Sequence, residues 1–277
     1  MSGPLRVGFV DYSLANYHAD TYLKLFRGPL AERATVCACY GEQTDASQAW
    51  AAKNQVTWAE SPAAVAQAAD LVMLLAPDNM ERHLPLAEQF FDAAAGKPVY
   101  VDKGLADNLE HARTLLELAE RHRIPLFCSS AVPFAPEFLA WQAKGEAARY
   151  FDAEGRGPGK WANYGVHTVS PALRAFGHDV VRLRAAGREG LVRVQLEWRD
   201  GRTAHLSVNR FSGEGFALWL TGENGTKRLD LNDGTFYQNL AAAVLDFAAT
   251  GQSPVPIQES LMILAILERA PQAQNEG

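Results

Sequence analysis

The sequence has few cysteines, and they are odd in number. Cys37, Cys39 and Cys128 are the only three in 277 residues, and each lies within an apolar run. This number excludes a disulfide scaffold and is typical of reduced thiols in a core, so we expect a cytoplasmic protein. No other cysteine or histidine lies at ligand spacing beside Cys37 and Cys39, and we therefore expect no metal site.

Long hydrophobic runs and blocks of one charge are also absent. No apolar stretch approaches the ~20 residues that a membrane-spanning helix needs, and the first residues lack the pattern of a signal peptide. The net charge of −6 is spread along the chain without a basic run. We therefore expect neither a membrane nor a nucleic acid as partner. Hydrophobic residues make up 48% and charged residues 21%, which is typical of a globular protein with a sizeable core.

Short apolar strands alternate with helices in the first half of the chain. Strands are predicted over residues 5–10, 34–40, 71–76, 98–101 and 125–128. Helices are predicted over residues 16–26, 45–53, 62–69, 81–95 and 108–121. Alternation of this kind favours a parallel sheet covered by helices. The pattern therefore predicts an α/β fold that begins with a Rossmann-like, doubly wound domain over residues 1–128.

The second half has a different pattern. Strands are predicted over residues 180–186, 191–199, 203–209, 215–221 and 227–231, followed by helices over 236–249 and 257–270. Asp200-Gly201 and Asn224-Gly225 are turn dipeptides that favour hairpins between neighbouring strands. We therefore predict an α+β domain over residues 129–277 with a mostly antiparallel open sheet.

Five segments, in order along the chain, carry a resemblance to a known family. They are the strand 6–10 with the helix that bears His18, residues 70–77, residues 96–103 (GKPVYVDK), residues 159–167 (GKWANYGVH) and residues 247–256. In this order they resemble the Gfo/Idh/MocA oxidoreductases, which are mostly sugar-directed NAD(P) enzymes. The resemblance implies a dinucleotide-binding first domain and a substrate-binding second domain.

The turn after the first strand lacks the glycines of a dinucleotide fingerprint. The corresponding positions hold Asp11, Ser13 and then Ala15 or Asn16, with Leu14 among them. Fingerprint glycines let the backbone approach the pyrophosphate, and a carboxylate at that place would repel it by several kcal/mol at ~4 Å. The alternative is that Asp11 and Ser13 cap the helix, which would also occupy its N-terminus.

Other cofactor positions differ as well. Tyr40 stands where an acid should bind the ribose, with Glu42 close behind it, although a plain aromatic at a strand end is the alternative. Pro77 matches the proline that follows a strand of the family's first domain. The family's Glu-Lys-Pro (EKP) motif corresponds to residues 102–104 of this chain, where Gly104 replaces the proline. We expect no cofactor; ordinary NAD(P) binding is the alternative, with the backbone amides of a divergent turn still holding the dinucleotide.

The resemblance also implies the catalytic residues. Lys103 would polarise or protonate the reacting oxygen, and His167 would act as general base or orient a hydroxyl. Asn163 replaces the family's aspartate and shares one helix face with His167, four residues later. The further residues expected to contact the substrate are Asp102, Arg156, Lys160, Trp161 and Tyr164. The alternative for Lys103 is a solvated loop lysine, and for His167 a core or surface histidine. The alternative for the segment before His167 is an exposed glycine-rich loop.

The leading hypothesis is an enzyme of this architecture that acts on a sugar-like, keto-bearing substrate by acid–base chemistry: elimination, hydration or isomerisation. The first rival is an NAD(P)-dependent sugar or polyol dehydrogenase with a divergent fingerprint. The second is a non-catalytic sugar-binding or scaffold protein. A homodimer or tetramer is expected through the C-terminal sheet, where Trp198, Leu206, Val208 and Trp219 either form the interface or cover the domain's own helices.

Overall fold

The computed structural model describes residues 3–275, with side chains described as far as residue 271. The chain forms two compact units. The first contains the chain up to Ser129 together with Leu240–Ile257, and the second contains Ser130–Asn239 and the chain from Gln258 onward. The sequence assigned residues 240–257 to the second domain. They belong with the first because Phe247 packs against Phe127 at 5.6 Å between ring centroids.

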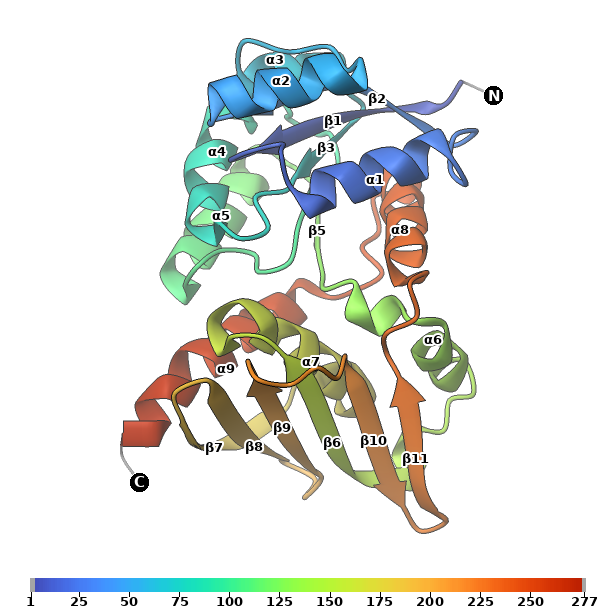
Figure 1. Cartoon of the computed structure of the whole chain (residues 1–277), viewed down its shortest axis with the longest axis vertical. Coiled ribbons are helices and arrows are strands. Elements are labelled where there is room, and N and C mark those ends of the chain that lie inside the picture. The colour runs from blue at the N-terminus through green and yellow to red at the C-terminus, as the bar shows by residue number, and fades with distance from the viewer. Residues whose placement is uncertain (1–2, 276–277) are drawn as a thin grey trace. The chain divides into compact units, whose positions relative to one another are not determined.

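The first unit contains a five-stranded sheet in the order β2-β1-β3-β4-β5, and every pairing in it is parallel (Figure 1). The strands are β1 (Leu5–Asp11), β2 (Ala34–Gly41), β3 (Leu71–Leu74), β4 (Val99–Val101) and β5 (Leu126–Cys128). The helices are α1 (Tyr17–Arg27), α2 (Thr44–Asn54), α3 (Pro62–Ala68), α4 (His83–Phe90), α5 (Leu109–Arg121) and most of α8 (Phe236–Thr250). The predicted Rossmann-like sheet is confirmed. The helix predicted over 81–95 is shorter, a 3-10 turn at Met80–Arg82 followed by α4.

The second unit contains a six-stranded sheet in the order β11-β10-β6-β9-β8-β7. Its strands are β6 (Tyr150–Pro158), β7 (Val180–Arg188), β8 (Leu191–Trp198), β9 (Thr203–Asn209), β10 (Ala217–Gly222) and β11 (Gly225–Asp230). Only the β6–β9 pair is parallel. The helices are α6 (Pro136–Gln142), α7 (Trp161–Phe176) and α9 (Ile257–Asn275). The predicted mostly antiparallel sheet is confirmed.

Strand β6 lies inside this sheet, although the sequence pattern gave no strand there. Glycine disfavours strands, and the segment carries Gly155 and Gly157. Both face the core, where they allow a close approach: a Cβ on Gly155 would lie 2.8 Å from Leu206, and one on Gly157 would lie 2.6 Å from the Phe216 ring. The glycines are thus required by packing rather than by a loop.

One face of this sheet packs on the unit's core, and the other is open. Trp198, Leu206 and Val208 are at most 2% exposed and lie in the core, so they do not form an outer interface. Trp219 lies on the open face, with the guanidinium of Arg156 stacked on its ring at 5.0 Å. A strand's alternation separates two faces but does not show which of them is covered. The predicted homo-oligomer stays a prediction.

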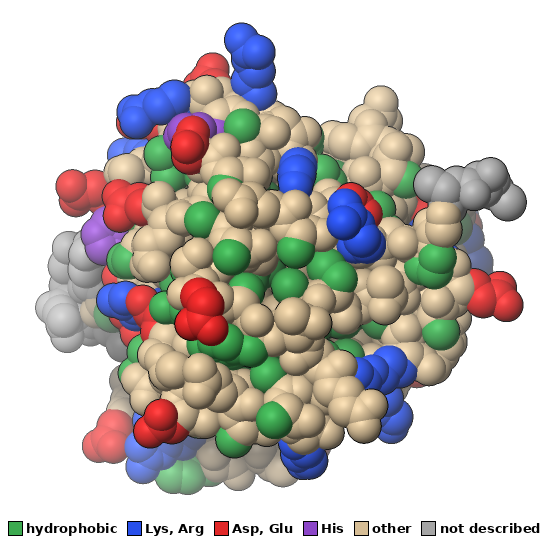
Figure 2. Space-filling model, turned by 90° about the horizontal axis from the view of Figure 1, so that it is seen from above, with side chains coloured by type: hydrophobic (Ala, Val, Ile, Leu, Met, Phe, Trp, Pro, Cys, Tyr) green, Lys and Arg blue, Asp and Glu red, His purple; other side chains and the backbone are tan. Residues whose placement is uncertain are grey.

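Charged side chains are mixed over the face of the molecule drawn in Figure 2, where basic and acidic groups alternate. This matches a net charge that is spread along the sequence. No helix within the described part of the chain combines the length and the apolar character needed to cross a membrane.

Candidate functional site

The carboxylate of Asp11 lies buried in the turn after β1. Asp11 ends the strand and is 1% exposed. Its Oδ1 accepts hydrogen bonds from the backbone N–H of Ser13 at 3.2 Å and of Ala76 at 3.1 Å. Its Oδ2 accepts a hydrogen bond from the Asn16 side-chain amide at 2.8 Å. The carboxylate therefore occupies the inside of the turn and binds backbone amides itself.

The first amides of α1 are also satisfied within the protein. The N-cap of α1 is Asn16, and not Asp11 or Ser13: its Oδ1 accepts from the N–H of His18 at 2.8 Å and of Ala19 at 3.0 Å. The N–H of the fully buried Leu14 donates to Ser47 Oγ at 3.2 Å. An amide that already donates to a protein oxygen is not available to a phosphate.

Burial dominates the electrostatics of Asp11. It raises the pKa of this carboxyl to about 7, although the hydrogen bonds from Asn16, Ser13 and Ala76 lower it. The negative charge of Asp102 raises it further. A phosphate brought to this place would add a third negative charge to two buried carboxyl groups.

The residues at the end of β2, where a dinucleotide's ribose would bind, are also engaged by other side chains. Glu42 follows β2, and its carboxylate accepts a hydrogen bond from Arg82 Nε at 2.7 Å and forms an ion pair with the same guanidinium. Tyr40 stacks on Trp58 with ring centroids 5.6 Å apart. A free acid at the end of the second strand is what a ribose hydroxyl requires. Together with the Asp11 turn, these residues do not fit a dinucleotide bound in the ordinary Rossmann manner.

The end of β4 carries a buried pair of charged residues, Asp102 and Lys103, which are 1% and 4% exposed. Lys103 Nζ donates to the carbonyl of Pro77 at 2.7 Å and lies 3.6 Å from the Asp78 carboxylate. The Asp102 carboxylate accepts from the Lys103 N–H at 2.8 Å and pairs with the imidazole Nδ1 of His18.

The ionised form of Asp102 is favoured in this environment. Burial raises the pKa of its carboxyl, but the charge and hydrogen bond of His18 and the amide of Lys103 outweigh this, so the pKa lies below its usual value. Gly104, which follows, has φ of +78°. Proline is fixed near −65°, so this loop cannot follow the course of an EKP segment.

His167 belongs to a separate cluster in the second unit. It lies on α7 and is 8% exposed, and its Nδ1 is 2.8 Å from Ser130 Oγ. The rings of Tyr164 and Phe216 meet it edge-on, with centroids 5.6 and 5.1 Å away. Asn163 lies one turn before His167 on the same helix. The rings of His167 and Tyr164 are thus in contact, and Asn163 precedes His167 by one helical turn.

Three further residues that the sequence predicted to contact the substrate are Arg156, Lys160 and Trp161, and each has its own surroundings in the structure. Trp161 is 6% exposed in the core, and its indole N–H donates to the Leu267 carbonyl at 3.2 Å. Lys160 is the exposed residue that precedes α7. Arg156 points to the open face of the sheet and bonds Glu154 at 2.7 Å. The structure therefore does not place Trp161 and Arg156 beside His167.

Several residues of these clusters were not found from the sequence. Asn16 could have been recognised as the N-cap, because it is the first residue of the helix predicted over 16–26 and asparagine is common at that position. Arg82, Ser130 and Phe216 gave no such signal, since each meets its partner through the fold rather than through local spacing.

No family model and no curated protein matches this sequence. Similar solved structures exist. GenD2 from gentamicin A biosynthesis, in complex with NAD, has a TM-score of 0.84 at 16% identity, covering 100% of this chain and 96% of that one. UDP-N-acetylglucosamine 3-dehydrogenase from Acidithiobacillus ferrooxidans has a TM-score of 0.78 at 18% identity, with 97% of both chains covered.

Another similar structure is biliverdin reductase from Synechocystis, in complex with biliverdin and NADP+. Its TM-score is 0.71 at 20% identity, with 98% of this chain and 99% of that one covered. Fold similarity at such identity fixes the architecture and not the substrate. The prediction from the five segments is confirmed at that level: this chain has the fold of the Gfo/Idh/MocA-type oxidoreductases.

Proposed function

We propose that this chain is an enzyme that acts on a sugar-like, keto-bearing substrate by acid–base chemistry, without binding NAD(P) in the ordinary way. The observation that carries the proposal is the buried Asp11 carboxylate, which takes the amides of Ser13 and Ala76 for itself. A ketone acidifies its neighbouring C–H bond, so elimination, hydration or isomerisation needs no hydride acceptor.

We assign an electrophilic role to Lys103 in the first unit. Its ammonium group is buried and is held by the Pro77 carbonyl. A fixed cation in a buried setting stabilises negative charge that develops on a carbonyl oxygen. Asp102 supports this arrangement from the other side, because it accepts the Lys103 backbone N–H and pairs with His18.

We assign the proton transfer to His167 in the second unit. Ser130 Oγ lies 2.8 Å from Nδ1 and orients the imidazole, whose ring we expect to move the proton. Asn163 would position the substrate or the imidazole from one turn earlier, and the half-exposed Tyr164 would contact the sugar.

An NAD(P)-dependent sugar dehydrogenase is the second candidate, and the comparisons favour it over the acid–base proposal. GenD2 has a TM-score of 0.84 and contains NAD, and UDP-N-acetylglucosamine 3-dehydrogenase also matches. Lys103 or His167 would serve a dehydrogenase equally well, since a lysine or a histidine can act on a reacting hydroxyl. The two candidates therefore differ in the cofactor and not in these side chains.

Titration of the full chain with NADH and NADPH, followed by nucleotide fluorescence, separates the two candidates. We expect no binding at micromolar concentrations, and micromolar affinity for either would overturn the acid–base proposal. Exchange of a substrate C–H in deuterated water, measured by NMR on a panel of keto-sugars, tests the chemistry. Lys103→Ala and His167→Ala should each abolish exchange, and unchanged exchange in both variants would refute the assigned roles.

A further inference from the structure

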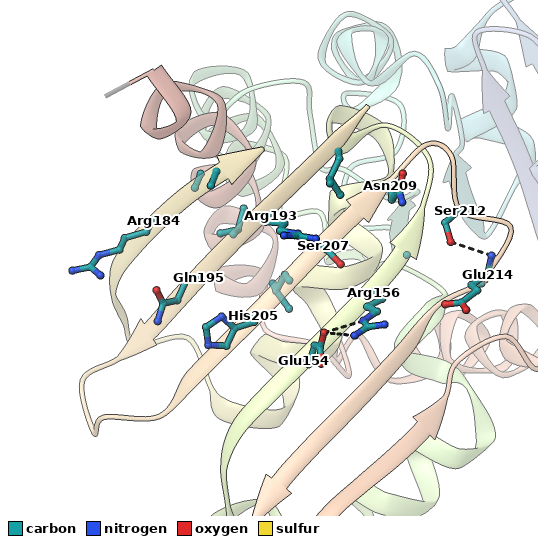
Figure 3. A pocket seen from close by; sticks show the side chains of 17 residues that line it. Glu154, Arg156, Arg184, Arg193, Gln195, His205, Ser207, Asn209, Ser212 and Glu214 are labelled. Carbon is teal, nitrogen blue, oxygen red and sulfur yellow. Dashed lines mark hydrogen bonds and ion pairs between the residues drawn. The ribbon is translucent and has the colours of Figure 1, made fainter. Parts of the chain in front are cut away.

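The open face of the second unit's sheet contains a hollow of about 490 Å³. Its floor is formed by β6, β7, β8 and β9, and residues 212–215 form one wall (Figure 3). A hollow on one face of a sheet forms where short side chains lie beside long ones, and the pairing of these strands places them so. Ala186, Arg193, Ser207 and Arg156 are paired in turn across four strands.

The next row of the same face is polar as well. It runs through Arg184, Gln195, His205 and Glu154, each paired with the one before it. Side chains two residues apart on a strand share a face, and opposite partners have Cβ atoms about 4.5–5.5 Å apart. The two rows therefore form a compact array of three arginines, one carboxylate, one imidazole, one amide and one hydroxyl beside Ala186.

The arginines of the array differ in their partners. Arg156 is neutralised by Glu154, which accepts from its Nη2 at 2.7 Å and its Nε at 2.9 Å. Arg184 and Arg193 have no carboxylate within ion-pair distance among the residues that the structure describes. Glu214 is the other acid of the lining, and its backbone N–H donates to Ser212 Oγ at 3.1 Å. The lining thus carries three arginines against two glutamates, a net positive charge in a chain whose net charge is −6.

We propose that this hollow binds a small hydroxylated anion, a sugar acid or a sugar phosphate. The guanidinium of Arg193 would take the acid group, because its planar fork matches a carboxylate or phosphate in two hydrogen bonds. Ser207 and Asn209 would contact the hydroxyls of the same ligand from the neighbouring strand. The site is separate from the proposed chemistry, since His167 lies on α7, which packs against the other face of this sheet.

Calorimetry on the full chain tests this assignment with glucuronate, glucose 6-phosphate, inorganic phosphate and neutral glucose. Both acidic sugars should bind, whereas glucose should bind at least about tenfold more weakly, the effect of losing a charge-assisted hydrogen bond. Arg193→Gln should weaken both acids by a similar factor. Arg182→Gln is the matched control: Arg182 lies on neighbouring β7 outside the hollow and is paired with Glu197, so its binding should be unchanged.

Three results would overturn the proposal. The first is the absence of binding by either acidic sugar, and the second is unchanged binding in both Arg193→Gln and Arg184→Gln. The third is inorganic phosphate binding as tightly as glucose 6-phosphate, which would show no sugar recognition. Sedimentation velocity of the same proteins supplies a fourth such result: a dimer that Arg193→Gln dissociates would make this face the interface of the homo-oligomer predicted from the sequence, and not a ligand site. Circular dichroism of each variant verifies folding.

Discussion

The buried carboxylate of Asp11 should give this protein an unusual dependence of stability on pH. In the folded protein its pKa is raised to about 7 by burial, against an ordinary value of 3.8. A carboxyl whose folded pKa exceeds its unfolded pKa favours folding below the unfolded value and loses that contribution as pH rises through the folded value. Asp11 should therefore reduce stability progressively between about pH 4 and pH 7.

The magnitude follows from the size of the shift. A difference of about three pKa units corresponds to about 4 kcal/mol of unfolding free energy at 1.36 kcal/mol per unit. Asp11→Asn removes the titration. Its amide would face the amide of Asn16 and so destabilise the turn, but that cost does not depend on pH. The difference between the two proteins should thus change by about 4 kcal/mol in the variant's favour from pH 4 to pH 8.

Urea unfolding of both proteins at half-unit steps of pH measures this difference. Asp70→Asn is a control of opposite sign. The hydrogen bond from Arg6 lowers the pKa of the Asp70 carboxyl, with burial opposing it in part, so Asp70 stabilises the fold at neutral pH and loses this contribution as pH falls. A wild-type-minus-Asp11→Asn difference that is flat with pH, or that rises with pH, would refute the electrostatic account of the turn.

Three further substitutions should affect stability through separate contacts, and thermal or urea unfolding measures each. Gly104→Ala should lower stability by about 1–3 kcal/mol, because φ is +78° and a Cβ would lie 2.0 Å from Met80 Sδ; unchanged stability would contradict the strained loop. Glu259→Gln should cost about 3–5 kcal/mol, since it removes the negative charge that lies 3.2 Å from the buried guanidinium of Arg174; a loss below 1 kcal/mol would count against this pairing. Phe247→Ala should cost about 3–5 kcal/mol if its 5.6 Å contact with Phe127 holds α8 to the first unit.

The strands of the first sheet could be predicted from the sequence because each is a short, mostly apolar run between turn residues. β1, β2 and β9 begin at the predicted residues. β6 could not be predicted, because its glycines disfavour a strand in isolation and are explained only by Phe216 and Leu206 packing against them. Local pattern thus identifies strands that carry an apolar or an alternating run. It fails where a partner far along the chain sets the residue type.

The same limit applies to the candidate site. The sequence identified Asp11 as the residue that departs from a dinucleotide turn, and gave capping of the following helix by Asp11 and Ser13 as the alternative to a carboxylate that repels the phosphates. The cap is Asn16, and Asp11 instead accepts from Ala76, which lies 65 residues away. No spacing rule connects these two positions, since they meet only because β1 and β3 are neighbours in the sheet.

The departures from a dinucleotide site converge on one segment, the loop after β3. Ala76 donates to Asp11, Pro77 accepts from Lys103, and Arg82 binds Glu42. This single loop is therefore bonded to the ends of β1, β2 and β4. Residues in one contact network do not contribute additively. Asp11→Gly alone would free two backbone amides but leave Arg82 on Glu42. On the acid–base proposal, ordinary cofactor binding would therefore require changes at several strand ends together.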